Sequence, residues 1–525
     1  MKYIYSSGRF LVSKGLVYLL ILYTLFRCSI VYSQTSYKKQ FKLLDEYFSQ
    51  SVVDFQMPGM AIAIIKDDSV IFSKGYGYLE MGKPERVDSR TIFAIASNTK
   101  AFTSAAVAVL VDEGKLKWDD KVTKYLPWFQ LYDPYVTFNM TIRDLLCHRS
   151  GLATFSGDLL WYATTYSREE VITRARYLQP RYGFRERYGY SNIMFLAAGE
   201  VVHAVSSQSW DDFVSEKFFK PLRMDRTCTS TNDLKKFENV ASPHTDFAGN
   251  TFAIPYLNWD NIAPAGSICS CVEDLSKWIK LHLNRGKLGS VQIFSEDRSR
   301  EMWSPNTLQN VSIYSEKNYP STHFKAYALG WGVNDYLGRK IVSHSGGYDG
   351  MTSFTCLIPE ERLGFVILTN KNSSLYSPLS YKILDIFLNG GDTDWCALML
   401  ENMKKQEEDD KMQQKQEENE RVTGTKPTLD LNSYAGLYGG ILYGNAKVSV
   451  ENNELRLVFA PAPQFNAVLK HWQYDTFTVR FEEFPSLPQG KVNFIINAAG
   501  RVEEMRIDVP NPDFDFTELI FKKFE

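Results

Sequence analysis

The chain has 525 residues, which is longer than one ordinary domain, so a main domain with smaller additions is expected. Its 59 Lys and Arg residues nearly balance 61 Asp and Glu residues, giving a formal net charge of −2. This balance excludes the basic character of proteins that bind nucleic acids or anionic membrane surfaces.

The N-terminus predicts a secretory signal peptide over residues 1–33. Basic residues precede an apolar run at 15–26, and small residues stand before Gln34. The alternative is an uncleaved membrane anchor, but the run is shorter than the roughly 20 residues that span a bilayer, and Arg27 interrupts it. We therefore expect a secreted, extracellular protein that has no membrane contact after the signal is cleaved.

Two further features fit an extracellular route. Cys28 leaves with the signal, and the remaining cysteines are even in number, which permits disulfides without prescribing their pairing. Candidate N-glycosylation sites of the form Asn-x-Ser/Thr begin at Asn139, Asn310 and Asn372.

Residues 34–395 are expected to form the main domain. A hairpin is predicted at 61–74, where two apolar runs flank a turn. A strand at 91–95 should lead into a helix whose apolar residues recur at helical spacing until Gly114, which is placed to end it.

The middle of this domain is predicted to be mostly helical. Thr141 and Ser270 are expected to open helices as N-caps. Strands at 353–358 and 363–369 and a helix at 375–388 should close the domain. Strands at both ends with helices between them indicate an α+β fold whose sheet is completed by the returning chain.

The composition changes after this domain. Residues 396–426 are largely charged and predict a solvated helical linker, and residues 427–525 contain short β-like runs broken by Gly and Pro. We expect a small β-barrel or sandwich that folds independently, because the linker offers no apolar face. If this unit overhangs the cleft of the main domain, it should restrict larger substrates.

Ser97 and Lys100 are the first candidate catalytic pair. Ser97 stands where the predicted strand meets the helix, and Lys100 follows one turn later on the same face. A serine hydroxyl needs a base to become nucleophilic, and a lysine amine sheltered from water can act as that base. Ser36 and Lys39 have the same spacing, but no apolar helix follows them.

Tyr190-Ser-Asn192 is a second element, with a phenol that can relay a proton and an amide that can hold a substrate carbonyl. Tyr256-Leu-Asn258 and Tyr443-Gly-Asn445 match the same pattern. The third element is the run 344–347, His-Ser-Gly-Gly, beside a predicted strand. Lys287-Leu-Gly289 is a rival for that position, although it follows a predicted helix.

Taken in order, Ser97-x-x-Lys100, Tyr190-x-Asn192 and the run from His344 resemble the serine β-lactamase and penicillin-binding-protein family, specifically its class C branch. Flanking segments are similar too, at 93–103, 145–152, 188–192, 264–266 and 329–331. The resemblance covers about residues 43–388 and implies an antiparallel sheet packed with a helical region.

The resemblance also implies a role for each residue. Ser97 would be acylated, and Lys100 and Tyr190 would share the work of general base. Asn192 would orient the substrate amide, and the backbone N–H groups of Ser97 and Gly347 would form the oxyanion hole.

His344, Ser345 and Gly346 would contact the substrate. His344 occupies a position that is Lys in many β-lactamases, and a neutral imidazole lacks the permanent charge that binds a substrate carboxylate. Relatives with His here resemble esterases and D-amino-acid peptidases, so a small ester or a peptide amide is the expected substrate.

Other classes of protein fit less well. An α/β-hydrolase needs G-x-S-x-G, which does not occur, and the scattered His residues predict no metal site and no cofactor. The remaining alternative is a catalytically idle, secreted binding protein associated with an extracellular matrix such as shell matrix, a role known in the family that the chain resembles.

Overall fold

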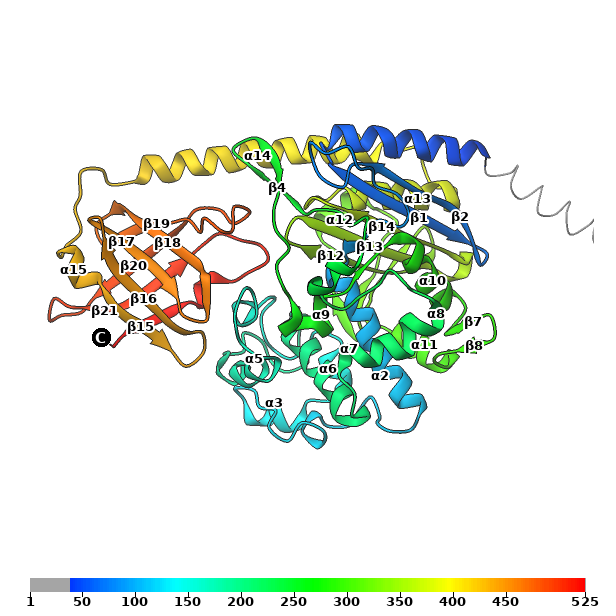
Figure 1. The fold of residues 1–525 in the computed structure, drawn as a ribbon, viewed down its shortest axis with the longest axis horizontal. Helices are drawn as coiled ribbons and strands as arrows, with labels where there is room; N and C mark the ends of the chain where they lie inside the picture. The colour runs from blue at the N-terminus through cyan, green and yellow to red at the C-terminus, as the bar shows by residue number, and fades with distance from the viewer. Residues whose placement is uncertain (1–37, 525) are drawn as a thin grey trace, which may run out of the picture.

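The main domain and a C-terminal barrel lie side by side in the computed structural model (Figure 1), which describes residues 38–524. The predicted signal peptide and its cleavage point at Gln34 lie outside the described residues. A helix over residues 38–54 begins the described chain.

The main sheet has eight antiparallel strands in the order β2-β1-β14-β13-β12-β11-β10-β9. The strands are β1 Gly59–Lys66, β2 Ser69–Gly77, β9 Thr307–Gln309, β10 Lys325–Tyr327, β11 Gly332–Tyr336, β12 Arg339–Tyr348, β13 Met351–Ile358 and β14 Leu363–Thr369. Because β1 pairs with β14, the returning chain completes the sheet as predicted.

Helices cover both faces of this sheet. In strand β1, Ile62 and Ile64 belong to one core cluster and Ala61 and Ala63 to the other. Both faces are therefore buried, which explains why the strand is apolar up to Ile65. The first cluster contains the helix at 38–54 and α13 Tyr376–Leu388, and the second contains α2 Thr99–Asp112 and α10 Val272–Leu283.

The helical region joins the two halves of the sheet. It contains α3 Pro134–Asn139, α4 Ile142–Leu145, α5 Arg168–Arg174, α6 Asn192–Ser206, α7 Trp210–Val214, α8 Lys220–Leu222, α9 Ala263–Gly266, α11 Glu296–Met302 and α12 Ile313–Asn318. Short strand pairs accompany it: β3 Phe93–Ala94 with β6 Cys269–Ser270, β4 His244–Phe247 with β5 Asn250–Ala253, and β7 Lys287–Leu288 with β8 Val291–Gln292.

The local signals were accurate except at two places. Gly114 follows α2 with a φ of +69°, and Thr141 caps α4 in a reciprocal capping box with Asp144, as predicted. The strand expected at 91–95 is only two residues long, because the chain turns at Ala96. The N-cap expected at Ser270 is wrong: Cys271 holds that position and makes no side-chain cap.

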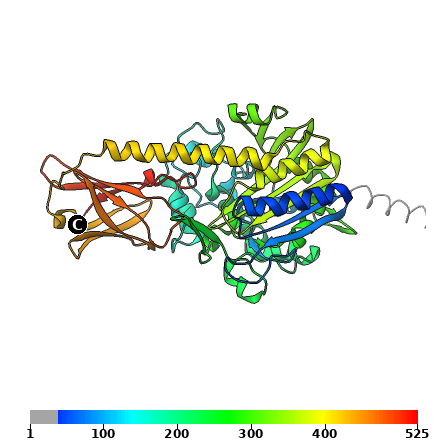
Figure 2. The same cartoon turned by 90° about the horizontal axis from the view of Figure 1, so that it is seen from above.

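The charged segment forms one long helix, α14 Trp395–Glu420. Its first turn is buried against the main domain, where the Tyr47 hydroxyl accepts the Cys396 N–H at 2.8 Å. Its later turns are exposed, as their charge predicts, and Figure 2 shows them running on past the main domain toward the barrel.

The C-terminal unit is a closed eight-stranded barrel in which strands adjacent in sequence pair. After the short helix α15 Leu431–Tyr434 come β15 Gly436–Gly440, β16 Gly444–Glu451, β17 Glu454–Phe459, β18 Ala462–Gln473, β19 Thr476–Val479, β20 Gly490–Ile496, β21 Val502–Asp508 and β22 Ile520–Lys523. Strand β15 pairs with β22 and closes the barrel. Of the two predicted architectures, the barrel is therefore confirmed and the sandwich is wrong.

The barrel also touches the main domain directly. The Glu518 carboxylate accepts hydrogen bonds from the Ser156 hydroxyl at 2.5 Å and from the Gly157 N–H at 2.9 Å. The ring of Tyr162 packs on the ring of Phe484, with centroids 5.5 Å apart. The two units therefore meet through a polar anchor and an aromatic contact, besides being joined by α14.

Candidate active site

Ser97 lies in a tight turn between β3 and α2. Ala96 before it has a φ of +46°, which is unfavourable for a residue with a Cβ and marks a sharp bend. The Ser353 hydroxyl donates to the Ile95 carbonyl at 2.6 Å and accepts from the Asn98 amide at 2.8 Å. These bonds fix both sides of the turn and hold Ser97 between the sheet and the helical region.

Strand β12 approaches this turn so closely that only glycine fits at position 346. A Cβ on Gly346 would stand 2.3 Å from the Ile95 carbonyl oxygen and 2.9 Å from the Ser97 nitrogen. A Cβ on Gly347 would meet nothing within 4 Å, because this residue faces the cavity. In the predicted third motif, Gly346 is therefore required by the close approach of the turn, whereas the space around Gly347 would admit a side chain.

Lys100 is fully buried beside Ser97. Its Nζ lies 3.0 Å from the Ser97 hydroxyl, 2.7 Å from the Asn192 side-chain oxygen and 2.9 Å from the Ala265 carbonyl. Burial lowers the pKa of Lys100 from 10.5 to about 7, although the nearby Asp158 carboxylate opposes this shift. At neutral pH a large fraction of this amine is therefore free to accept a proton.

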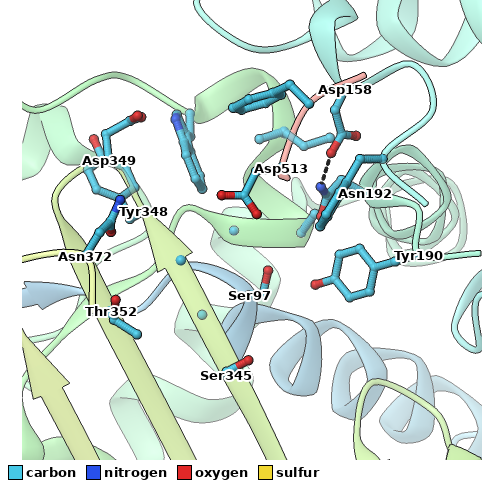
Figure 3. A pocket seen from close by; sticks show the side chains of 18 of the residues that line it. Ser97, Asp158, Tyr190, Asn192, Ser345, Tyr348, Asp349, Thr352, Asn372 and Asp513 are labelled. Carbon is cyan, nitrogen blue, oxygen red and sulfur yellow. Dashed lines mark hydrogen bonds between the residues drawn. The ribbon is translucent and has the colours of Figure 1, made fainter. Parts of the chain in front are cut away.

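Asn192 links Lys100 to a carboxyl group that the sequence did not reveal. Its side-chain NH₂ donates to Asp158 at 2.6 Å (Figure 3), while its oxygen accepts from Lys100. Asp158 is buried, and burial raises its pKa to about 7. This link fixes which end of the Asn192 amide faces the lysine.

Tyr190 points its hydroxyl toward Ser97 (Figure 3). Burial raises the pKa of Tyr190 well above its usual value, and a hydrogen bond with Ser97 opposes this effect, so the phenol stays protonated. The His148 ring supports the phenol, with centroids 4.1 Å apart. Because the Ser191 N–H donates to His148 Nδ1 at 3.0 Å, the imidazole proton is on Nε2.

His344 is buried and neutral. Its Nδ1 lies 2.5 Å from the Ser345 carbonyl and therefore carries the proton, so Nε2 accepts from the Tyr327 hydroxyl at 2.8 Å. Burial and the neighbouring Lys100 lower the pKa of His344 to about 3. The position thus supplies no positive charge, as its residue type predicts.

A cavity of about 570 Å³ lies beside these residues, within the usual range for a small-molecule site. Its lining includes Ser97, Tyr190, Asn192 and the run 344–347, so the structure brings the predicted motifs together. The lining residues that the sequence did not single out include Asp158, Asp349 and Asp513. Of these three, only Asp349 had a signal nearby, because it lies two residues after the third motif.

The rival motifs lie elsewhere. Lys287 belongs to the short hairpin β7–β8, the Tyr256 hydroxyl bonds to the Ala241 carbonyl, and Tyr443 lies in the barrel beside Glu518. Ser36 lies outside the described residues.

The candidate glycosylation sites differ in setting. Asn310 is exposed, and Asn139 ends α3 with its side chain bonded to the Tyr135 carbonyl. Asn372 is exposed and lines the cavity, so a glycan on it would stand at the mouth of the site.

Within residues 38–524, no group of three or more His, Cys, Asp and Glu side chains is placed to hold a metal ion. No helix in the same part of the chain is both long and apolar enough to cross a membrane.

The fold and this site define a serine hydrolase of the β-lactamase and penicillin-binding-protein type. Its sequence matches the Beta-lactamase family over residues 44–385, and the chain belongs to that family. Residues 420–523 match a second family, described as a domain of unknown function, DUF3471.

Curated relatives and solved structures agree with this assignment. Protein flp of Staphylococcus aureus strain MRSA252 is 29% identical over 371 residues, covering 69% of each chain. The unguisins hydrolase ungD' of Aspergillus campestris is 30% identical over 358 residues, covering 65% of this chain and 64% of its own. The octameric penicillin-binding protein homologue from Pyrococcus abyssi has the same fold, with a TM-score of 0.61 and 22% identity over 90% of this chain and 98% of its own.

Proposed function

We propose that the protein hydrolyses a small ester or a peptide amide, including one of a D-amino acid, through an acyl-enzyme on Ser97. The observation that carries this proposal is the buried Lys100 amine, which lies 3.0 Å from the Ser97 hydroxyl and has a pKa of about 7. A neutral amine at this distance can take the serine proton, and Tyr190 is placed to relay it.

The reaction follows from these positions. The Ser97 Oγ forms a bond to the substrate carbonyl carbon as its proton passes to Lys100, and the negative oxygen is held by the N–H groups of Ser97 and Gly347. The carbonyl to leaving-group bond then breaks, and the leaving group takes the proton. Water, deprotonated by the same base, attacks the ester of Ser97 and releases the acid, which restores the serine hydroxyl.

The substrate class rests on His344. A neutral histidine gives no fixed charge for the carboxylate of a β-lactam, which makes antibiotic hydrolysis the weaker assignment. The name of the Aspergillus relative, a hydrolase of unguisins, also supports a hydrolytic role.

Covalent labelling tests the proposal. A fluorophosphonate should attach to Ser97 of the full chain, and Ser97→Ala should remove the label while thermal unfolding stays unchanged. Ser304→Ala is the matched control, because Ser304 is an exposed serine outside the cavity, and it should keep the label. Labelling that survives Ser97→Ala would refute the mechanism, and no labelling at all would favour the idle, matrix-associated alternative.

We also propose that the protein is secreted after cleavage before Gln34, because the N-terminal apolar run is too short to span a bilayer. N-terminal sequencing of protein from the culture medium should find Gln34 first. Intact Met1 in a membrane fraction would reverse this assignment.

A further inference from the structure

The cavity in front of Ser97 is acidic. The charged side chains in its lining are Asp158, Asp349 and Asp513, and the lining contains no Lys or Arg. Lys100 is not part of the cavity lining. Its amine contacts Ser97, Asn192 and the Ala265 carbonyl instead. The charge that a substrate meets on entering is therefore negative.

Asp513 comes from the barrel and not from the main domain. Figure 3 shows its carboxylate extending into the cavity near Ser97 from the segment between β21 and β22. The Asn511 side chain accepts the N–H groups of Asp513 and Phe514 at 2.7 and 3.0 Å, which gives this segment a defined shape. The Asp513 carboxylate itself has no hydrogen-bond donor among residues 38–524.

The barrel segment is anchored to the main domain directly after this carboxylate. The Phe514 ring packs on Tyr162 with centroids 4.2 Å apart, and Glu518 is bonded to Ser156 and Gly157 of the main domain. Asp513 is thus held over the cavity by the contact between the two units.

Asp349 presents a second carboxylate from the turn between β12 and β13. One of its oxygens accepts the Tyr162 hydroxyl at 2.6 Å, and the other is buried with no hydrogen-bond partner among the described residues. Burial and the repulsion from Asp513 both raise the pKa of Asp349, to about 6. Burying an unpaired carboxylate oxygen is unfavourable, and a cation bound in the adjoining cavity would reduce that cost.

Aromatic rings complete the wall. Trp259 and Tyr348 line the cavity with their centroids 4.6 Å apart, and Phe514 lines it from the barrel side. Faces of Trp, Tyr and Phe attract ammonium groups, and carboxylates add a full opposite charge. Acid and aromatic side chains together form the lining expected around an organic cation.

We propose that the Asp513 carboxylate binds an ammonium group of the substrate, while Asp349 adds negative charge to the same cavity, so that the enzyme prefers positively charged esters and amides. This inference rests on the function proposed above and adds the charge of the substrate. It also gives the barrel a purpose, because the main domain alone lacks Asp513.

The test compares two substrates that differ in one charge. Alanine p-nitroanilide carries a free ammonium, and N-acetyl-alanine p-nitroanilide is neutral. We expect the full-length protein to show a kcat/KM at least about 10-fold higher for the charged one, as one charge-assisted hydrogen bond can provide. N-acetyl-lysine p-nitroanilide distinguishes an ammonium on the side chain from one next to the scissile carbonyl.

Asp513→Asn should lower this preference about 10-fold, mainly through KM, because the amide keeps the shape and loses the charge. Asp508→Asn is the matched control, since Asp508 is an exposed carboxylate of the same barrel outside the cavity, and it should keep the preference. Equal kcat/KM values for the two substrates, or a preference that survives Asp513→Asn, would overturn the inference. If Ser97 is still labelled in that case, the proposed hydrolase function stands. Loss of Ser97 labelling would instead remove the proposed function and the inference together.

Discussion

The pH dependence of acylation gives the sharpest test of the role of Lys100. An amine with the ordinary pKa of 10.5 is neutral in about one molecule in 3,000 at pH 7, whereas a pKa of about 7 makes half of the molecules neutral. Burial thus increases the population of the free base about 10³-fold. The rate of acylation should rise with pH, with an inflection near pH 7, because only the neutral amine can accept the serine proton.

Lys100→Ala should lower acylation at least about 10²-fold and remove the inflection. The assay is kcat/KM for p-nitrophenyl butyrate between pH 5 and 9, corrected for spontaneous hydrolysis. Unimpaired acylation in this variant, or an inflection that persists in it, would refute the assignment of Lys100 as base.

Asp158→Asn separates the two buried groups that have pKa values near 7. The Asp158 carboxylate raises the pKa of Lys100, so its loss should move the inflection to lower pH and keep it visible. Disappearance of the inflection in Asp158→Asn would assign it to the carboxyl group instead.

Three further changes probe the structure around the site. Gly346→Ala should lower the melting temperature and slow acylation at least about 10-fold, because its Cβ would collide with the turn that holds Ser97, whereas Gly347→Ala should leave the melting temperature unchanged. Oxidised glutathione should join Cys228 and Cys269 in a disulfide and be reduced to two thiols. These residues exchange backbone hydrogen bonds of 3.0 and 2.9 Å, and such a pair has the Cα separation that a disulfide needs. Peptide mass mapping would reveal the cross-link, and full alkylation of both thiols would exclude it. Asp144→Ala should reduce the free energy of unfolding in urea by about 3 kcal/mol, because Arg149 and Arg185 both lose the buried carboxylate that they bind. A loss below about 1 kcal/mol would contradict this account.

Local signals in the sequence were enough to predict which motifs meet at the cavity. Ser97 and Lys100 are one helical turn apart, and a spacing of three residues on an apolar helix fixes their proximity. Asn192 was predicted from its neighbour Tyr190, and the structure places its side chain against Lys100.

Residues that reach the site through tertiary folding could not be predicted in this way. Asp158 lies in a short helical turn with no motif around it, and it meets Asn192 only because the helical region folds back. Asp513 belongs to another folding unit, so no spacing relates it to Ser97.

The choice between a barrel and a sandwich was open for a different reason. Strand β15 has the sequence Gly-Leu-Tyr-Gly-Gly, and β22 has two lysines among four residues, so neither has a strong strand propensity. These are the strands that close the barrel, and their pairing is decided by the rest of it. The choice between barrel and sandwich therefore needed the structure.

Helix α14 also limits how the length of this protein can vary. It has 26 residues, and each residue added to an α-helix advances the chain by about 1.5 Å and rotates the downstream domain by about 100°. A single insertion would turn the barrel away from its contacts with the main domain, whereas seven residues would restore the direction but displace the barrel by about 10 Å. Insertions and deletions in this helix should therefore be rare in natural variants that keep Asp513 over the cavity, even though its exposed, charged surface tolerates substitution freely.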